Sequence, residues 1–151
     1  MDENSKKRPL VLIADDDEDD FELWKKAFSD ASGSTCDFRW AENGVRLVDY
    51  MKRQNGFEDP ADSPKPDLIL LDLNMPFMDG RQALREIKAS EDWSSIPVVA
   101  MTLSTNPEDA KYCYKNGASS VINKPFGLEQ TRKLFENLSR YWFQTVRLPE
   151  P

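Results

Sequence analysis

Short apolar segments alternate with amphipathic segments along most of this chain. Three of the apolar segments lack a polar residue at every second position, which predicts strands that are buried on both faces. Two weaker candidates complete a set of five. The predicted strands are Leu10–Ala14, Cys36–Trp40, Leu68–Leu71, Val98–Met101 and Ser120–Asn123.

Apolar residues at helical spacing follow each of these strands. The predicted helices cover Phe21–Ala31, Val45–Arg53, Arg81–Ser90, Pro107–Asn116 and Leu128 to about Val146. Regular alternation of strands and helices favours a parallel sheet with right-handed crossovers and helices on both faces. The expected fold class is therefore α/β, a three-layer (βα)5 sandwich around a five-stranded parallel sheet.

Three interruptions stand out between the predicted elements. Segment 54–66 is rich in Pro, Asp and Gly, which predicts an irregular loop inserted before the third strand, either a tolerated surface insertion or a contact surface for a partner. In loop 73–80, Gly80 is expected to supply a backbone conformation that other residues resist. The exit from the fifth strand at 123–126 contains an X-Pro bond, for which the cis form is an option.

Length and charge narrow the classes of function. A chain of 151 residues suits one domain, which we place at 9–146, with a disordered polar tail at 1–8 and a second tail at 147–151. The net charge of −7, from 27 acidic and 20 basic residues, opposes non-specific binding to nucleic acid or an anionic membrane. No segment resembles a secretion signal or a membrane span. The expected partners are proteins or small phosphates.

Rare and missing residue types narrow the chemistry. The two cysteines, Cys36 and Cys113, lack the spacing of a metal or redox motif and fit a reducing cytoplasm. The chain has no histidine, which excludes most zinc sites, Ser-His and Cys-His nucleophile pairs, and a role as histidine phosphodonor. Any chemistry must come from carboxylates, hydroxyls and lysines.

Polar residues directly follow four of the five predicted strands. These residues are Asp15 and Asp16 after the first strand, Asp72 after the third, Thr102 after the fourth and Lys124 after the fifth. Ligands of open parallel sheets bind beyond the carboxyl ends of the strands, so we expect these side chains to form one site. Converging carboxylates without soft ligands predict a hard cation, and Mg²⁺ suits them, with Mn²⁺ as an alternative. Asp72 is then a candidate nucleophile that forms an aspartyl phosphate, and Thr102 and Lys124 are candidate contacts to phosphoryl oxygens.

The remaining acids of segment 15–20 have an ordinary interpretation. Asp17 or Asp19 is a suitable N-cap for the first helix, and Glu18 and Asp20 are expected to be solvated with them. An EF-hand loop counted from the start of this segment is excluded, because its sixth position lacks Gly and its twelfth lacks Glu.

Four motifs together resemble one known family. They are VLIADDDEDD at the first strand, DLILLDLNMPFMDG around Asp72, IPVVAMTLS at the fourth strand and VINKPF at the fifth. Over residues 9–140 the chain resembles the receiver domain of two-component response regulators. The resemblance implies a flavodoxin-like fold with strand order 2-1-3-4-5. It also implies that Asp72 accepts a phosphoryl group from a phosphohistidine of a sensor histidine kinase.

The same resemblance implies roles for the other site residues. Mg²⁺ is held by Asp15, Asp16, Asp72 and the main-chain carbonyl of Asn74. Thr102 and Lys124 serve as the switch residue and the phosphate contact. Such a protein is a switch rather than an enzyme, since it catalyses only its own phosphoryl transfer and dephosphorylation.

A narrower resemblance links the chain to stand-alone regulators that partner phytochrome-type, light-sensing histidine kinases. It rests on loop 54–66 and on the C-terminal segment NLSRYWFQTVRLP. Two positions depart from the common receiver pattern. Val121 occupies the position where many receivers carry an aromatic toggle, and Leu103 follows the switch hydroxyl where a small residue is usual.

The last helix is the candidate output surface, because no residues remain for an output domain. Leu134, Leu138 and Tyr141 are expected to face the core. The apolar residues expected outside this stripe are Phe135, Trp142, Phe143 and Val146. Exposed aromatic residues indicate an interface, so we expect a homodimer through this helix and tail. The alternative is a tail that folds back on its own domain.

Two other classes of protein remain as alternatives. Asp15 and Asp17 form the D-x-D of haloacid dehalogenase-type aspartyl-phosphate hydrolases, although those enzymes carry a second acid pair and a cap that this sequence lacks. A receiver-like scaffold that does not switch would require an idle site.

Overall fold

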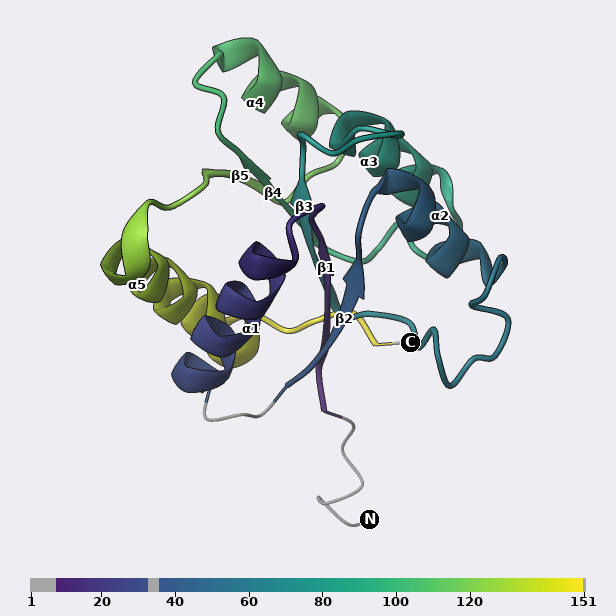
Figure 1. Ribbon diagram of the computed structural model, residues 1–151, viewed down its shortest axis with the longest axis horizontal. Coiled ribbons are helices and arrows are strands. Elements are labelled where there is room, and N and C mark those ends of the chain that lie inside the picture. The colour runs from purple at the N-terminus through teal and green to yellow at the C-terminus, as the bar shows by residue number, and fades with distance from the viewer. Residues whose placement is uncertain (1–7, 33–35, 151) are drawn as a thin grey trace.

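The computed structural model describes residues 8–32 and 36–150, and it contains a single parallel sheet (Figure 1). Of the tail expected at 1–8, only Arg8 lies within the described residues. The strands are β1 (Leu10–Ala14), β2 (Asp37–Ala41), β3 (Leu68–Asp72), β4 (Val98–Thr102) and β5 (Ser120–Asn123). Their order is β2-β1-β3-β4-β5, with every neighbouring pair parallel, so the predicted fold class and strand order are confirmed.

Strands β2, β3 and β4 each end one residue later than predicted. The last residues of β3 and β4 are Asp72 and Thr102, which still pair with the neighbouring strand. A boundary drawn at the last apolar residue misses them, because the backbone ladder does not depend on side-chain polarity. Two of the candidate site residues are therefore held by strand backbone rather than by loops.

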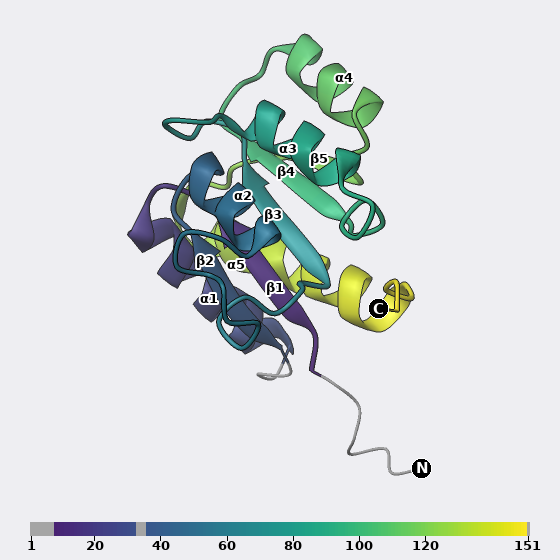
Figure 2. The ribbon, with the colours of Figure 1, turned by 90° about the vertical axis from the view of Figure 1, so that its right-hand side faces the viewer.

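Helices cover both faces of the sheet. They are α1 (Glu18–Ser32), α2 (Gly44–Lys52), α3 (Gly80–Ala89), α4 (Pro107–Lys115) and α5 (Gly127–Arg140), followed by a π-helical turn, η2 (Tyr141–Thr145). Helices α1 and α5 pack together on one face, and α2, α3 and α4 lie on the other (Figures 1 and 2). None of the described helices is long and apolar enough to cross a bilayer.

Strand β1 shows why the buried strands lack polar alternation. Val11 and Ile13 contribute to the core beneath α1 and α5, whereas Leu12 and Ala14 contribute to the core beneath α2, α3 and α4. All four side chains are fully buried. Since successive side chains of a strand point to opposite faces, a strand covered on both faces must be apolar throughout.

The requirement for glycine at position 80 is steric rather than conformational. Gly80 does not have a positive φ, contrary to expectation. A Cβ at this position would instead overlap the carbonyl oxygen of Asp72 and the backbone of Leu73. The first turn of α3 therefore lies directly against the end of β3, and only a residue without a side chain fits there. Within the described residues no peptide bond is cis, so the X-Pro bond at the exit from β5 is trans.

The C-terminal segment differs from the expectation in two ways. Helix α5 ends at Arg140, and the assignment of its faces was partly wrong. Leu138 is buried and Leu134 packs against the same core, as predicted. Phe135, expected outside, is fully buried, whereas Tyr141 is 51% exposed. Trp142 and Phe143 are half-buried against the core beneath α1 and α5, and the Phe143 ring lies 5.6 Å from that of Phe28. Both the stripe at 134, 138 and 141 and its neighbour at 135, 138 and 142 satisfy helical spacing, so periodicity alone did not decide between them.

Loop 54–66 is attached to α2 by an ordered set of hydrogen bonds. The Asp49 carboxylate accepts hydrogen bonds from the side chains of Gln54 and Asn55 at 3.0 and 2.9 Å. The Tyr50 hydroxyl donates to the carbonyl oxygen of Pro64. This loop lies at the amino ends of the strands, opposite the edge where Asp15 and Asp72 are found.

Candidate functional site

The carboxyl edge of the sheet carries the polar residues singled out in the sequence. Asp15 immediately follows β1, Asp72 and Thr102 are the last residues of β3 and β4, and Lys124 follows β5. These four strands are adjacent in the sheet. The parallel direction of the strands therefore brings residues that are up to 109 positions apart to one edge.

Three carboxylates form the centre of the site. Asp15, Asp16 and Asp72 each offer an oxygen, and these oxygens lie within 4.8 Å of one another. Asp15 and Asp72 are almost completely buried, whereas Asp16 is exposed. Backbone N–H groups orient the two buried carboxylates: that of Asp17 donates to Asp15 Oδ1 at 2.8 Å and that of Asn74 donates to Asp72 Oδ1 at 2.9 Å. The cluster thus has two fixed ligands and one open to solvent.

Lys124 supplies the positive charge of the cluster. Its Nζ lies 3.1 Å from Asp72 Oδ2 and 3.2 Å from Asp15 Oδ2, and its side chain is only 14% exposed. The ammonium also lies 5.6 Å from the centre of the Trp24 ring, within the range of a cation–π contact. One lysine is therefore shared between two buried carboxylates.

Asp20 belongs to this site, although we assigned it to a solvated group. Its Oδ2 lies 3.6 Å from Lys124 Nζ. Helix α1 begins at Glu18, earlier than predicted, so Asp20 occupies the first helical turn. The available signal was its spacing of four residues from the buried Trp24, which places both on one helix face. Asp17 behaves as expected, since its Oδ1 accepts a hydrogen bond from the N–H of Asp19 at 2.8 Å and caps α1.

The titration of the site reflects the crowding of its carboxylates. Burial raises the pKa of Asp15 to about 7, and the charges of Asp72 and Asp20 add to this effect against the lowering influence of the Asp17 N–H and Lys124. For Lys124, burial opposes the charged form, but Asp15 and Asp72 outweigh it and raise its pKa. The site has more negative charge than one ammonium neutralises.

The donor set fits a hard divalent cation. It consists of carboxylate oxygens in a compact cluster without cysteine or histidine, which matches the preference of Mg²⁺ for oxygen ligands and partial hydration. The exposed side of Asp16 leaves space for water or a phosphate oxygen. The N–H of Asn74 is held by Asp72, which fixes the peptide beside the cluster. Of the residues that would hold a cation, Asp15 and Asp72 are thus already oriented by backbone hydrogen bonds.

Thr102 is buried beside the cluster and carries its own hydrogen bond. Its side chain is 2% exposed, and its Oγ1 accepts from the N–H of Ser104 at 2.9 Å. The carbonyl oxygen of Thr102 accepts from the N–H of Lys124 at 2.8 Å, which ties the ends of β4 and β5 together. The next residue, Leu103, is 59% exposed and extends from the rim of the site.

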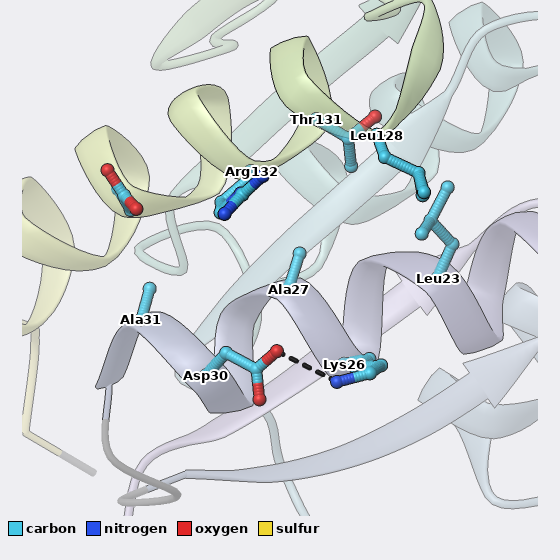
Figure 3. A pocket seen from close by; sticks show the side chains of 9 residues that line it. Leu23, Lys26, Ala27, Asp30, Ala31, Leu128, Thr131 and Arg132 are labelled. Atoms are coloured by element: carbon cyan, nitrogen blue, oxygen red, sulfur yellow. Dashed lines mark hydrogen bonds and ion pairs between the residues drawn. The ribbon is translucent and has the colours of Figure 1, made fainter.

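A second concave region lies between α1 and α5, away from the carboxylates (Figure 3). This groove of about 270 Å³ has an apolar lining that includes Leu23, Ala27 and Leu128. Lys26 and Asp30 pair with each other at 2.9 Å along its edge. Its lining also carries polar side chains, among them Thr131 and Arg132. Among the described residues, however, the acidic groups that converge closely enough to hold a cation lie at the carboxyl edge of the sheet, which is therefore the candidate chemical site.

Comparison with known proteins agrees with this geometry. Residues 11–136 match the response regulator receiver domain family. Response regulator Rcp1 of Synechocystis sp. is 32% identical over 151 residues, which cover 99% of each chain. The crystal structure of the phosphorylated cyanobacterial phytochrome response regulator RcpA superposes with a TM-score of 0.87 at 28% identity, covering 95% of this chain and 100% of that one.

A second solved structure bears on the metal. The Mn²⁺-bound form of Rcp1 superposes with a TM-score of 0.85 at 31% identity, covering 94% of this chain and 99% of that one. The fold, the family match over most of the sequence and the full-length relatives agree with one another. This chain belongs to the response regulator receiver domain family.

Proposed function

We propose that this protein is a phosphorylation-activated response regulator in which Asp72 accepts a phosphoryl group from a phosphohistidine of a sensor histidine kinase. The observation that carries the proposal is the position of Asp72 between two further carboxylates and Lys124 at the carboxyl edge of the sheet. The proposed location is the cytoplasm, which suits a chain whose two cysteines, Cys36 and Cys113, lack the spacing of a metal or redox motif.

The proposed reaction is a direct transfer to the Asp72 carboxylate. One of its oxygens bonds to phosphorus while the P–N bond breaks and the electron pair remains on the imidazole nitrogen. Lys124 exchanges its contact with Asp72 Oδ2 for a phosphoryl oxygen, and the Thr102 hydroxyl donates to another. Hydrolysis of the acyl phosphate by water returns the resting state. The protein is thus a switch that catalyses only these two steps on itself.

Mg²⁺ is the proposed cofactor, and Mn²⁺ is the alternative. Asp15, Asp16, Asp72 and the carbonyl of Asn74 would hold it. When bound, the cation supplies positive charge that permits the acids and the incoming phosphoryl group to coexist. The oxygen cluster supports this assignment, as does the Mn²⁺-bound structure of the related Rcp1.

The proposed kinase partner is of the phytochrome type. The support is the similarity to RcpA and Rcp1 along the full chain, which includes loop 54–66 and the C-terminal segment. Output passes through protein contacts, and no role for nucleic acid or membrane is proposed. Trp142 and Phe143 retain partly exposed apolar surface on η2, which supports a homodimer through this region. Sedimentation of the double variant Trp142→Ala and Phe143→Ser beside the parent tests the proposed dimer. A parent that is already monomeric would contradict the proposal.

The hydrolase alternative is not supported. The family match is to receiver domains, and Asp17, which completes the D-x-D pattern, is exposed and caps α1 rather than joining the carboxylates. The second acid of the D-x-D pattern is therefore explained by its role as the cap of α1.

Acetyl phosphate with Mg²⁺ tests the proposal directly. The intact protein is expected to gain the mass of one phosphate, and Asp72→Asn is expected to gain none. Labelling at Asp15 would instead favour a hydrolase. Absence of labelling, including with a phosphorylated histidine kinase as donor, would favour a scaffold that does not switch.

A further inference from the structure

The backbone at the start of the acidic segment is tied to the edge strand β2. The N–H of Asp15 donates to the carbonyl oxygen of Ala41 at 3.1 Å, which continues the ladder between β1 and β2 by one residue. Strand β2 ends at Ala41, and the chain then turns into α2, which begins at Gly44. The regular ladder therefore ends at Asp15, directly before Asp16.

A side chain takes over where the ladder ends. The ring N–H of Trp40 donates to the carbonyl oxygen of Asp15 at 2.8 Å. This oxygen belongs to the planar peptide group that links Asp15 to Asp16, so the hydrogen bond fixes the orientation of that peptide. Because an indole has one donor and no acceptor, its hydrogen-bonding capacity is committed to this contact.

The indole ring of Trp40 is itself held in place. It stacks on the ring of Phe21 from α1, with centroids 5.5 Å apart and planes inclined by 17°. Phe21 is buried, and Trp40 is partly buried against the core beneath α1 and α5. A ring packed in this way has little freedom to rotate, so its N–H points in a fixed direction.

Asp16 is the acid whose position depends most on this peptide. The carboxylates of Asp15 and Asp72 each accept a backbone N–H. In the part of the chain that the structure describes, the exposed carboxylate of Asp16 has no hydrogen-bond or ion-pair partner. One of its oxygens nevertheless lies within 4.8 Å of those of Asp15 and Asp72. The place of Asp16 in the cluster therefore follows from the course of its backbone, which the Trp40 hydrogen bond sets on the N-terminal side.

We propose that Trp40 is a positioning residue of the cation site: its ring N–H holds the Asp15–Asp16 peptide and thereby places the Asp16 carboxylate beside Asp15 and Asp72. The proposal rests on the proposed function, and in particular on the cation assigned to these acids. Mg²⁺ accepts little departure from octahedral geometry, so a ligand on a loosely held backbone binds it less well. Groups that orient metal ligands from behind change metal affinity by about 10- to 100-fold. Because Trp40 acts on the backbone of a ligand, we expect the lower end of that range.

Mn²⁺ binding by the unphosphorylated protein tests the proposal, with free Mn²⁺ measured by electron paramagnetic resonance. Trp40→Phe keeps a ring that can stack on Phe21 but removes the N–H. Its dissociation constant for Mn²⁺ is expected to rise about tenfold. Trp40→Tyr, which also lacks a donor at this point of the ring, should show the same rise and replaces Trp40→Phe if that variant does not fold. An unchanged dissociation constant in a folded variant overturns the proposal.

Asp16→Asn separates positioning from a general effect on the fold. Because Trp40 acts through Asp16, adding Trp40→Phe to Asp16→Asn should weaken Mn²⁺ binding by no more than about twofold. A purely structural role would weaken binding equally in both backgrounds. A further tenfold loss in the Asp16→Asn background therefore overturns the proposal.

Trp93→Phe is the matched control, because Trp93 precedes β4 at the opposite edge of the sheet. Its dissociation constant should equal that of the parent, and an equal loss there would assign the effect to stability and overturn the proposal. Urea unfolding verifies that each variant is folded. A parent that binds no Mn²⁺ overturns the cation site and with it the role of Trp40, whereas a parent that gains no phosphate at Asp72 overturns the proposed function itself.

Discussion

Asp15 and Asp49 are both buried carboxylates, and they lie at opposite ends of the sheet. Asp49 is 5% exposed, and its oxygens accept hydrogen bonds from Gln54, Asn55 and Arg46. Burial raises its pKa, but these hydrogen bonds outweigh burial and leave the pKa lowered. Asp15 has fewer donors of its own, because Lys124 is shared with Asp72 and Asp20.

The difference shows that burial alone does not assign a role to a carboxylate. A buried acid whose donors satisfy it completely stabilises the fold, as Asp49 does for loop 54–66. A buried acid among other acids stores unfavourable charge that an additional cation can relieve. Asp15 is of the second kind, because burial and its acidic neighbours raise its pKa to about 7.

The largest effect should come from Asp15→Asn. We expect phosphorylation by acetyl phosphate to fall by about 100-fold, the scale for loss of one preorganised electrostatic group, because the cation loses a ligand. Stability should remain the same or rise, since the variant removes one crowded negative charge. Mass spectrometry of the phosphorylated protein measures the fall in phosphorylation, and urea unfolding measures the stability. A marked loss of stability would place Asp15 in the same class as Asp49.

The opposite result is expected for Asp49→Ala. Three donors lose their acceptor. The side chains of Gln54 and Asn55 are exposed and can bond to water instead, so the free energy of unfolding should fall by only about 2 kcal/mol. The rate of phosphorylation should not change, since loop 54–66 lies at the far end of the sheet. Asp62→Ala, an exposed acid of the same loop, is the control and should unfold like the parent.

The pH dependence of stability sharpens the comparison at Asp49. Its folded pKa is below the ordinary value of 3.8, so its contribution to stability is present above the unfolded pKa and is lost as the pH falls through the folded pKa. The parent should therefore be more stable than Asp49→Asn at pH 6, and the gap should narrow below about pH 4. Urea midpoints of both proteins at several pH values measure this difference in stability. A difference that widens in acid would contradict a lowered pKa for Asp49.

The smallest effect is expected at Asp20, which lies at the edge of the crowded site. Asp20→Asn removes one competitor for Lys124 and one negative charge near the incoming phosphate. The rate of labelling by acetyl phosphate should rise about two- to threefold, within the range of a partly exposed ion pair. Asp19→Asn, one residue earlier on α1, serves as control. A fall in rate for Asp20→Asn would make this residue a supporting ligand instead of a competitor.

Prediction from sequence succeeded where a single residue follows a buried strand. Asp15, Asp72, Thr102 and Lys124 were identified in this way, and all lie at the carboxyl edge of the sheet. It failed at Asp20, because the start of α1 was placed too late and the rotation of the helix was therefore not known.

The last helix shows a different reason for failure. Two apolar stripes overlap on α5, and the sequence contains no feature that ranks them. The structure selects Phe135, which packs at 5.0 Å from the Phe28 ring of α1. Nothing in the sequence indicated that Asp49 would be a buried acceptor. Its donors Gln54 and Asn55 belong to a loop, and hydrophobic periodicity does not predict where a loop runs.

The sequence by itself determined the order of the elements, the parallel sheet and the identity of the residues at its carboxyl edge. This was possible because strands buried on both faces are apolar throughout and end at one common edge. Only the tertiary structure decided which acids share Lys124, which face of α5 is buried and how loop 54–66 is held. Those outcomes depend on helix rotation and on distances between segments far apart in the chain, and short-range patterns do not contain either quantity.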